Sequence, residues 1–102
     1  MNHYLIMYVP PRADFAKNAT PEESAVIERH FEYLKGKQAD GSLILAGRTD
    51  DARFGIAVIQ ADTEDAAREI MANDPSVKEG VFTGELLPFR LALGGRGVIG
   101  WL

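Results

Sequence analysis

The segment at residues 3–9 constrains the fold most, because it describes a strand that is apolar on both of its faces. It is rich in aromatic and β-branched side chains and ends at Pro10 and Pro11. Successive side chains of a strand point to opposite faces. One face would carry Tyr4, Ile6 and Tyr8, and the other would carry His3, Leu5, Met7 and Val9. A strand of this kind needs a cover on both sides.

A helix is predicted from about residue 21 to residue 39. Thr20 can cap it, Pro21 suits its first position, and Glu23 completes a capping box. Gly41 supplies the stop, since glycine adopts the left-handed conformation in which helices often end. The apolar side chains that recur at helical spacing are Val26, Ile27, Phe31 and Leu34.

Three more strands and a second helix complete the predicted order. The second helix starts near Thr63, with Glu64 and Asp65 in its first turn, and stops before Pro75. The strands are predicted at residues 42–46, 54–61 and 82–93. A turn-forming segment of hairpin length separates the first two of these. Pro88 in the last strand cannot donate to a ladder, so it is expected at a sheet edge.

The order β-α-β-β-α-β indicates an α+β fold made of two split β-α-β halves. It predicts a four-stranded antiparallel sheet with both helices on one face. The chain of 102 residues has the size of one domain. We assign residues 1–93 to this domain and residues 94–102 to a glycine-rich C-terminal tail that contains Trp101.

Two helices can cover only one face of such a sheet, so the opposite face needs another partner. An exposed apolar patch of this kind often marks a contact with a second chain, and symmetric pairing is the commonest arrangement. We therefore expect a homodimer. The alternative is that the tail folds back over the open face.

Charge and composition narrow the classes of partner. The net charge of −4, without a cluster of Lys and Arg, disfavours nucleic acid. The absence of cysteine removes disulfides, thiolate catalysis and thiolate metal sites. The first apolar run is too short for a membrane span and lacks the layout of a signal peptide. We expect no membrane contact and a cytoplasmic location.

His30 and Asp74 are the candidate catalytic residues. His30 lies four residues after Val26 and four before Leu34, so it falls on the apolar stripe of its helix. A buried imidazole needs a hydrogen-bond partner, and that partner could equally be a backbone carbonyl in the core. Asp74 would face the unfavourable end of a helix dipole, or would simply serve the Asn-Asp-Pro turn. Antiparallel helices would bring the two together, and a carboxylate would then orient the imidazole as a general base.

Other residues give weaker signals. Tyr8 could line a pocket or pack in the core, and Arg48 could bind an anionic ligand or remain a solvated turn residue. No residues are spaced as a metal site, so no metal is predicted. The serines Ser24, Ser42 and Ser76 lack the context of a catalytic nucleophile.

Several motifs, taken in order, resemble the YCII-related (YciI-like) family over nearly the whole chain up to residue 93. They are Tyr4-Leu5-Ile6-Met7-Tyr8, Arg29-His30-Phe31-Glu32-Tyr33-Leu34, Asp40-Gly41-Ser42-Leu43-Ile44-Leu45-Ala46-Gly47 and Asn73-Asp74-Pro75 with Val77, Gly80 and Val81. The resemblance implies a ferredoxin-like fold of the dimeric α/β-barrel type, and a recurring histidine and aspartate that fall on His30 and Asp74. One branch of the family looks like a cofactor-independent dechlorinating enzyme that acts on a hydroxylated aromatic. Two positions depart from the pattern: Ser76 stands where an aromatic often follows Asp-Pro, and Arg48 stands where a proline often follows the glycine.

These observations favour a small-molecule enzyme that uses acid–base chemistry without a metal or organic cofactor. It would be an isomerase, or a lyase of the dehalogenase type, in which His30 moves a proton and Asp74 orients it. Tyr8 and Arg48 would bind the substrate in a pocket between the helices and the sheet. The alternative is a non-catalytic module for small-ligand binding or dimerisation, with His30 as a core residue.

Overall fold

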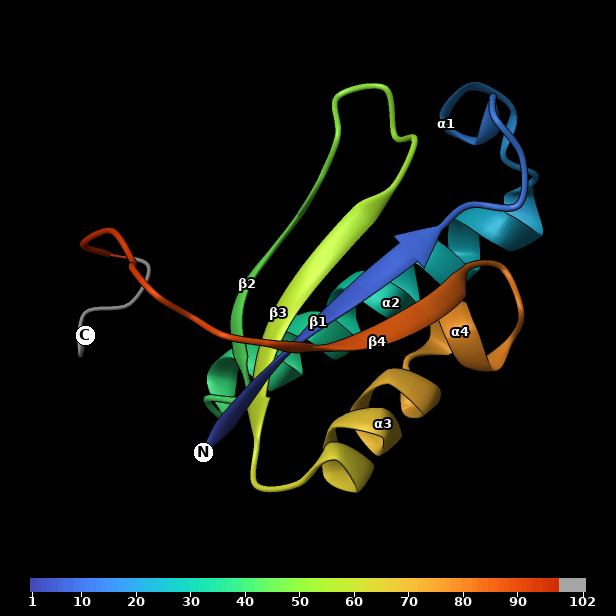
Figure 1. Ribbon diagram of the computed structural model, residues 1–102. Coiled ribbons are helices and arrows are strands. Elements are labelled where there is room, and N and C mark those ends of the chain that lie inside the picture. Colours follow the sequence, from blue (N-terminus) through green and yellow to red (C-terminus); the bar gives the residue numbers. More distant parts are fainter. Residues whose placement is uncertain (98–102) are drawn as a thin grey trace.

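Four antiparallel strands form one sheet, and both long helices lie on the same face of it (Figure 1). The computed structural model describes residues 1–97. The elements are β1 (Asn2–Val9), α1 (Phe15–Asn18), α2 (Pro21–Ala39), β2 (Leu43–Arg48), β3 (Gly55–Ala61), α3 (Glu64–Asn73), α4 (Pro75–Lys78) and β4 (Thr83–Phe89). The predicted order and fold class are therefore confirmed. The prediction for Trp101 lies outside the described residues.

The strand order is β2-β3-β1-β4, so β1 pairs with β3 on one side and β4 on the other. Pro88 lies in β4, an edge strand, as expected. Tyr8, near the end of β1, is paired with Gly55 of β3 and with Gly84 of β4. Two neighbours without side chains thus flank this tyrosine.

Four details differ by more than one residue from the sequence prediction. β2 runs to Arg48 and not to residue 46, because Gly47 and Arg48 still pair with Ile56 and Gly55 of β3. β4 ends at Phe89, not at residue 93, because Phe89 pairs with His3 at the very start of β1 and no partner strand continues beyond it. Two helices of four residues, α1 and α4, were not predicted. Each contains little more than one turn, which is too short to show helical periodicity.

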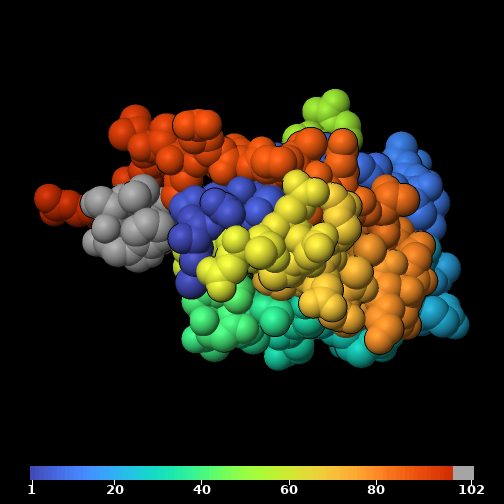
Figure 2. Space-filling model, turned by 60° about the horizontal axis from the view of Figure 1, so that its bottom comes forward, coloured from blue at the N-terminus to red at the C-terminus, as the bar shows by residue number. Residues whose placement is uncertain are grey.

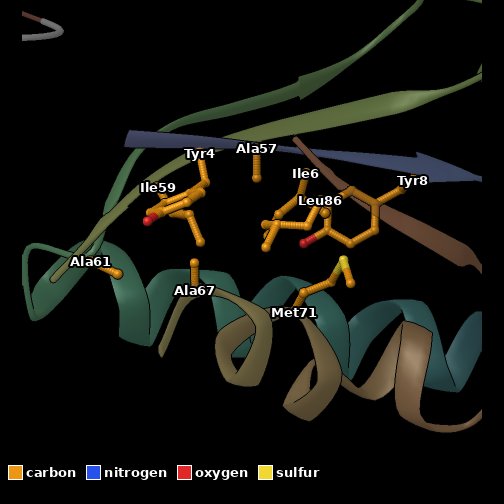
Figure 3. Packing of buried hydrophobic residues seen from close by; sticks show 9 residues of the cluster. All are labelled: Tyr4, Ile6, Tyr8, Ala57, Ile59, Ala61, Ala67, Met71 and Leu86. Carbon is orange, nitrogen blue, oxygen red and sulfur yellow. The ribbon is translucent and has the colours of Figure 1, made fainter. Parts of the chain in front are cut away.

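The hydrophobic core lies between the sheet and α3 (Figure 3). Its buried members are Tyr4, Ile6, Tyr8, Ala57, Ile59, Ala61, Ala67, Met71 and Leu86. Helices α2, α3 and α4 form one continuous layer over this face of the sheet (Figure 2). No helix within residues 1–97 is long and apolar enough to cross a membrane.

No helix or strand within residues 1–97 covers the other face of the sheet (Figure 1). The strand pairings place Leu45, Val58, Leu5 and Leu87 in one apolar row that crosses all four strands. Leu45 and Leu87 are 36% and 37% exposed. The prediction that both faces of β1 carry apolar side chains is correct, but helices of the described residues cover only one of these faces (Figure 1).

The first turn of α2 holds the predicted capping box. The Thr20 side chain accepts a hydrogen bond from the Glu23 backbone N–H, and the Glu23 carboxylate accepts one from the Thr20 N–H. Arg12 also binds this carboxylate through both terminal nitrogens, at 2.7 and 2.9 Å. These contacts fix the start of the helix that carries His30, and they tie the segment containing α1 to it.

Candidate active site

Asp74 is a fully buried carboxylate at the junction of two helices. It is the C-cap of α3 and also the N-cap of α4, where its side chain accepts a hydrogen bond from the Ser76 N–H. The sequence placed Asp74 either at the unfavourable end of a helix or in an Asn-Asp-Pro turn. The structure confirms that it ends α3 and adds that its side chain is turned to the N-terminus of the next helix, where a carboxylate is a favoured cap.

Four hydrogen-bond donors converge on this carboxylate. The Tyr8 hydroxyl donates to Oδ2 at 2.9 Å, and His30 Nδ1 lies 2.8 Å from both carboxylate oxygens. The Ser76 N–H and hydroxyl donate to Oδ1 at 2.9 and 2.8 Å. An ionised carboxylate has about four lone-pair sites, so these donors occupy its accepting capacity.

The surroundings hold the Asp74 carboxyl in its charged form. Burial alone raises its pKa, but the hydrogen bond and charge of His30 and the two bonds from Ser76 bring the pKa below its usual value. For the Tyr8 phenol, burial and the nearby Asp74 charge both raise the pKa. Tyr8 therefore stays protonated and remains a donor.

His30 projects from the buried side of α2, and its side chain is 13% exposed. A charged carboxylate can only accept hydrogen bonds, so Nδ1 carries the proton of the neutral ring and Nε2 keeps the free electron pair. The ring meets Tyr8 and Phe82 edge-on, at centroid distances of 5.0 and 5.6 Å. The contact between His30 and Asp74 that the topology suggested is present.

A cavity of about 340 Å³ lies between α2, the β2–β3 hairpin and the segment that holds α1. His30, Tyr8 and Arg48 all line it, whereas Asp74 lies behind His30 and does not reach the cavity wall. The remaining lining residues are Pro10, Phe15, Ala16, Ile27, Phe31, Leu34, Ala46, Gly47, Ala52, Phe54, Gly55, Ile56 and Phe82. All four residues singled out from the sequence thus belong to one site, in two layers.

Ser76 is the site residue that sequence reasoning missed. Its side chain is fully buried, and its hydroxyl lies 3.2 Å from His30 Nδ1 as well as contacting Asp74. In the sequence, Ser76 lacks the context of a nucleophile and departs from the pattern of the family that the chain resembles, and neither observation indicates a contact with Asp74. The available signal was the Asp-Pro-Ser turn itself, because an aspartate N-cap accepts from the N–H two or three residues further on. Nothing in the sequence indicated that the Ser76 hydroxyl contacts both Asp74 and His30.

No group of three or more His, Cys, Asp or Glu side chains that could hold a metal ion occurs among residues 1–97. The donor set around His30 and Asp74 is instead a closed hydrogen-bond network.

Comparisons with known proteins bear on the fold and the family of this chain. A solved structure, 5-chloro-2-hydroxyhydroquinone dehydrochlorinase (TftG) from Burkholderia phenoliruptrix AC1100 in complex with 2,5-dihydroxybenzoquinone, is similar with a TM-score of 0.59 and 19% identity. The similarity covers 87% of this chain and 95% of that one, and at this identity it establishes the fold. No curated protein sequence matches. The model of the YCII-related domain matches residues 1–90, nearly the whole domain, and the chain therefore belongs to the YCII-related domain family.

Proposed function

We propose that this protein is a small-molecule enzyme that transfers a proton with His30 as general base and without a metal or organic cofactor. The supporting observation is that His30 Nδ1 lies 2.8 Å from both oxygens of the Asp74 carboxylate, a contact that favours the ring proton on Nδ1. The neutral ring then offers Nε2 as its proton acceptor in a side chain that lines the cavity. Within residues 1–97, the hydrogen bonds of this ring are made by Nδ1.

The reaction is a proton shift at an atom next to a carbonyl group. His30 Nε2 takes the proton from a C–H bond next to the carbonyl group of the substrate, and the electron pair of that bond moves towards the carbonyl oxygen to give an enolate. If the imidazolium returns the proton to another carbon, the outcome is isomerisation. If the enolate expels a neighbouring leaving group with its bonding electrons, the outcome is elimination. General base catalysis of this kind contributes about 10²–10⁴-fold.

Asp74 and Tyr8 serve this base in different ways. The Asp74 charge stabilises the imidazolium that forms during proton transfer. The Tyr8 ring lines the cavity and contacts the substrate, while its hydroxyl holds Asp74 at 2.9 Å. Arg48 contacts the substrate from the hairpin side of the cavity. The similar fold of a dehydrochlorinase makes elimination the first reaction to examine.

The assembly that we propose is a homodimer formed through the open face of the sheet. Its support is the apolar row across the four strands, including the exposed Leu45 and Leu87. Replacing Leu87 with Asp should lower the mass measured by light scattering from that of a dimer to that of a monomer. A wild-type protein that is monomeric at all concentrations would contradict the dimer.

The His30→Asn variant tests the catalytic proposal. The asparagine amide can still donate to Asp74, but it has no counterpart of Nε2. We expect wild-type protein to catalyse deuterium uptake from D₂O by at least one member of a panel of hydroxyquinones, cyclic ketones and lactones, followed by NMR. The variant should lose this activity by at least about 100-fold.

Glu28→Gln is the matched control, because Glu28 lies on the same helix and is exposed. It should exchange at the wild-type rate. If His30→Asn folds and exchanges as fast as the control, His30 is not the base. Binding of a panel member without exchange by wild-type protein would favour the alternative, a non-catalytic ligand-binding module.

A further inference from the structure

The walls of the cavity are mainly apolar. Five aromatic rings line it, from Tyr8, Phe15, Phe31, Phe54 and Phe82. Its volume of about 340 Å³ lies at the small end of the usual range for ligand pockets. Aromatic rings around a cavity of this volume suit a compound with one ring, because offset or edge-on contacts between rings add to the burial of apolar area.

The charges around the cavity have one sign. No Asp or Glu side chain lines it, and the charged or chargeable nitrogen groups that do are His30 and Arg48. Asp74 lies behind the wall, and its oxygens already accept from four donors. An anion inside therefore meets the positive charge of Arg48 beside apolar walls, where charge interactions are less screened than in water.

Arg48 is placed to face the cavity. It is paired with Gly55, two positions along β3 from the buried Ala57, so both lie on the helix side of the sheet. Gly55 keeps this place open. A Cβ atom built there would lie 3.2 Å from the Gly47 carbonyl oxygen and 3.6 Å from the Arg48 Cβ.

Arg48 differs in its partners from four of the six other arginines. Arg12, Arg29, Arg53 and Arg68 each lie within 4 Å of a carboxylate. Arg48 instead donates from Nη1 to two backbone carbonyls, those of Thr49 and Asp50, at 3.0 and 3.1 Å. These bonds hold the guanidinium beside the hairpin. Its charge has no carboxylate partner among residues 1–97.

We infer that the substrate is a small, flat ring compound with one negative group, and that Arg48 binds this group while the aromatic walls hold the ring. This inference rests on the proposed function, and it specifies which substrates the base can reach. Arg48 anchors one edge of the ring and so directs another edge at His30. A guanidinium in that place also stabilises the charge that grows on a substrate oxygen during proton transfer.

Binding of benzoate and benzamide tests the inference, since the two have nearly the same shape and differ in charge. Titrations followed by NMR should show benzoate binding about tenfold more tightly than benzamide, the size expected for charge-assisted hydrogen bonds. Acetate, which has the charge without the ring, should bind more weakly than benzoate. Arg48→Gln should abolish the preference for benzoate over benzamide, and Arg48→Lys should keep most of it.

Arg53→Gln is the matched control, because Arg53 lies on the same hairpin, is exposed and pairs with Asp51. It should bind benzoate as wild type does. Equal affinities for benzoate and benzamide, or a benzoate preference that survives in folded Arg48→Gln, would overturn the inference. His30→Asn should still prefer benzoate. The two proposals can therefore fail separately. If benzoate is preferred through Arg48 but wild-type protein never catalyses exchange, the proposed function is wrong and the inference on Arg48 stands.

Discussion

Replacing Tyr8 with Phe removes one of the four donors from the buried Asp74 carboxylate and changes little else. The hydroxyl is 2.9 Å from Oδ2, and both side chains are nearly or fully buried. A hydrogen bond to a charged group contributes about 1.5–3 kcal/mol, and its loss leaves a buried oxygen without a partner. We expect the free energy of unfolding to fall by about 2 kcal/mol, which corresponds to about 8–16 °C in Tm for a domain of this size.

Urea unfolding at pH 7 and fixed protein concentration measures this loss. If the free energy of unfolding depends on urea concentration with the same slope in both proteins, the folded and unfolded states are equally compact in both. Tyr4→Phe is the control, because Tyr4 lies on the same strand and face, is 5% exposed and makes no hydrogen bond to Asp74. It should change stability by less than about 0.5 kcal/mol. Equal results for the two variants would refute the assigned role of the Tyr8 hydroxyl.

The comparison of wild type with Tyr8→Phe also tests the effect of alkaline pH on stability. Because the folded-state pKa of Tyr8 is raised, its stabilising contribution is complete below the ordinary value near 10 and falls as pH rises above it. The stability difference between wild type and Tyr8→Phe should therefore narrow above about pH 10.

Two further predictions concern Asp74 and the packing beside it. Ser76→Ala removes a bond that lowers the Asp74 pKa, so that pKa should rise and the loss of stability on acidification should begin at higher pH; a titration of the Asp74 carboxyl carbon by NMR that matches wild type would contradict this. Gly84→Ala would place a Cβ atom 3.0 Å from Met71 Sδ, and urea unfolding should show a loss of about 1–3 kcal/mol. Gly36→Ala is the control: its Cβ would have nothing within 4 Å, and it should stabilise the helix by about 0.5–1 kcal/mol. A neutral or stabilising Gly84→Ala would show that the Met71 side chain moves aside without cost.

The fold was predictable where one segment carried several independent signals. The start of α2 combined a cap, a proline and a capping box, and the structure contains all three. The end of β4 could not be predicted, because Leu91 and Leu93 continue the alternation while the partner strand has already ended. A pattern in one strand contains no information on the length of its neighbour.

The site was predictable to the extent that it follows from helical spacing and topology. His30 falls on the buried side of α2, and the antiparallel helices bring the end of α3 to it. The second role of Asp74 was not visible, because a helix of one turn, α4, follows it directly. The charge argument from the sequence therefore placed Asp74 correctly at the end of α3, but it missed the favourable N-terminus of α4 that the side chain caps.

The origin of the four donors shows why this site can form only in the assembled domain. The Ser76 donors come from the same turn as Asp74, so local sequence sets that part of the network. His30 arrives from α2 and Tyr8 from β1, at separations of 44 and 66 residues along the chain. Without these two, the carboxylate would lose the partners that offset the cost of its burial. The charged Asp74 thus requires the packed sheet and helices, and it in turn favours the His30 tautomer on which the proposed proton transfer at Nε2 depends.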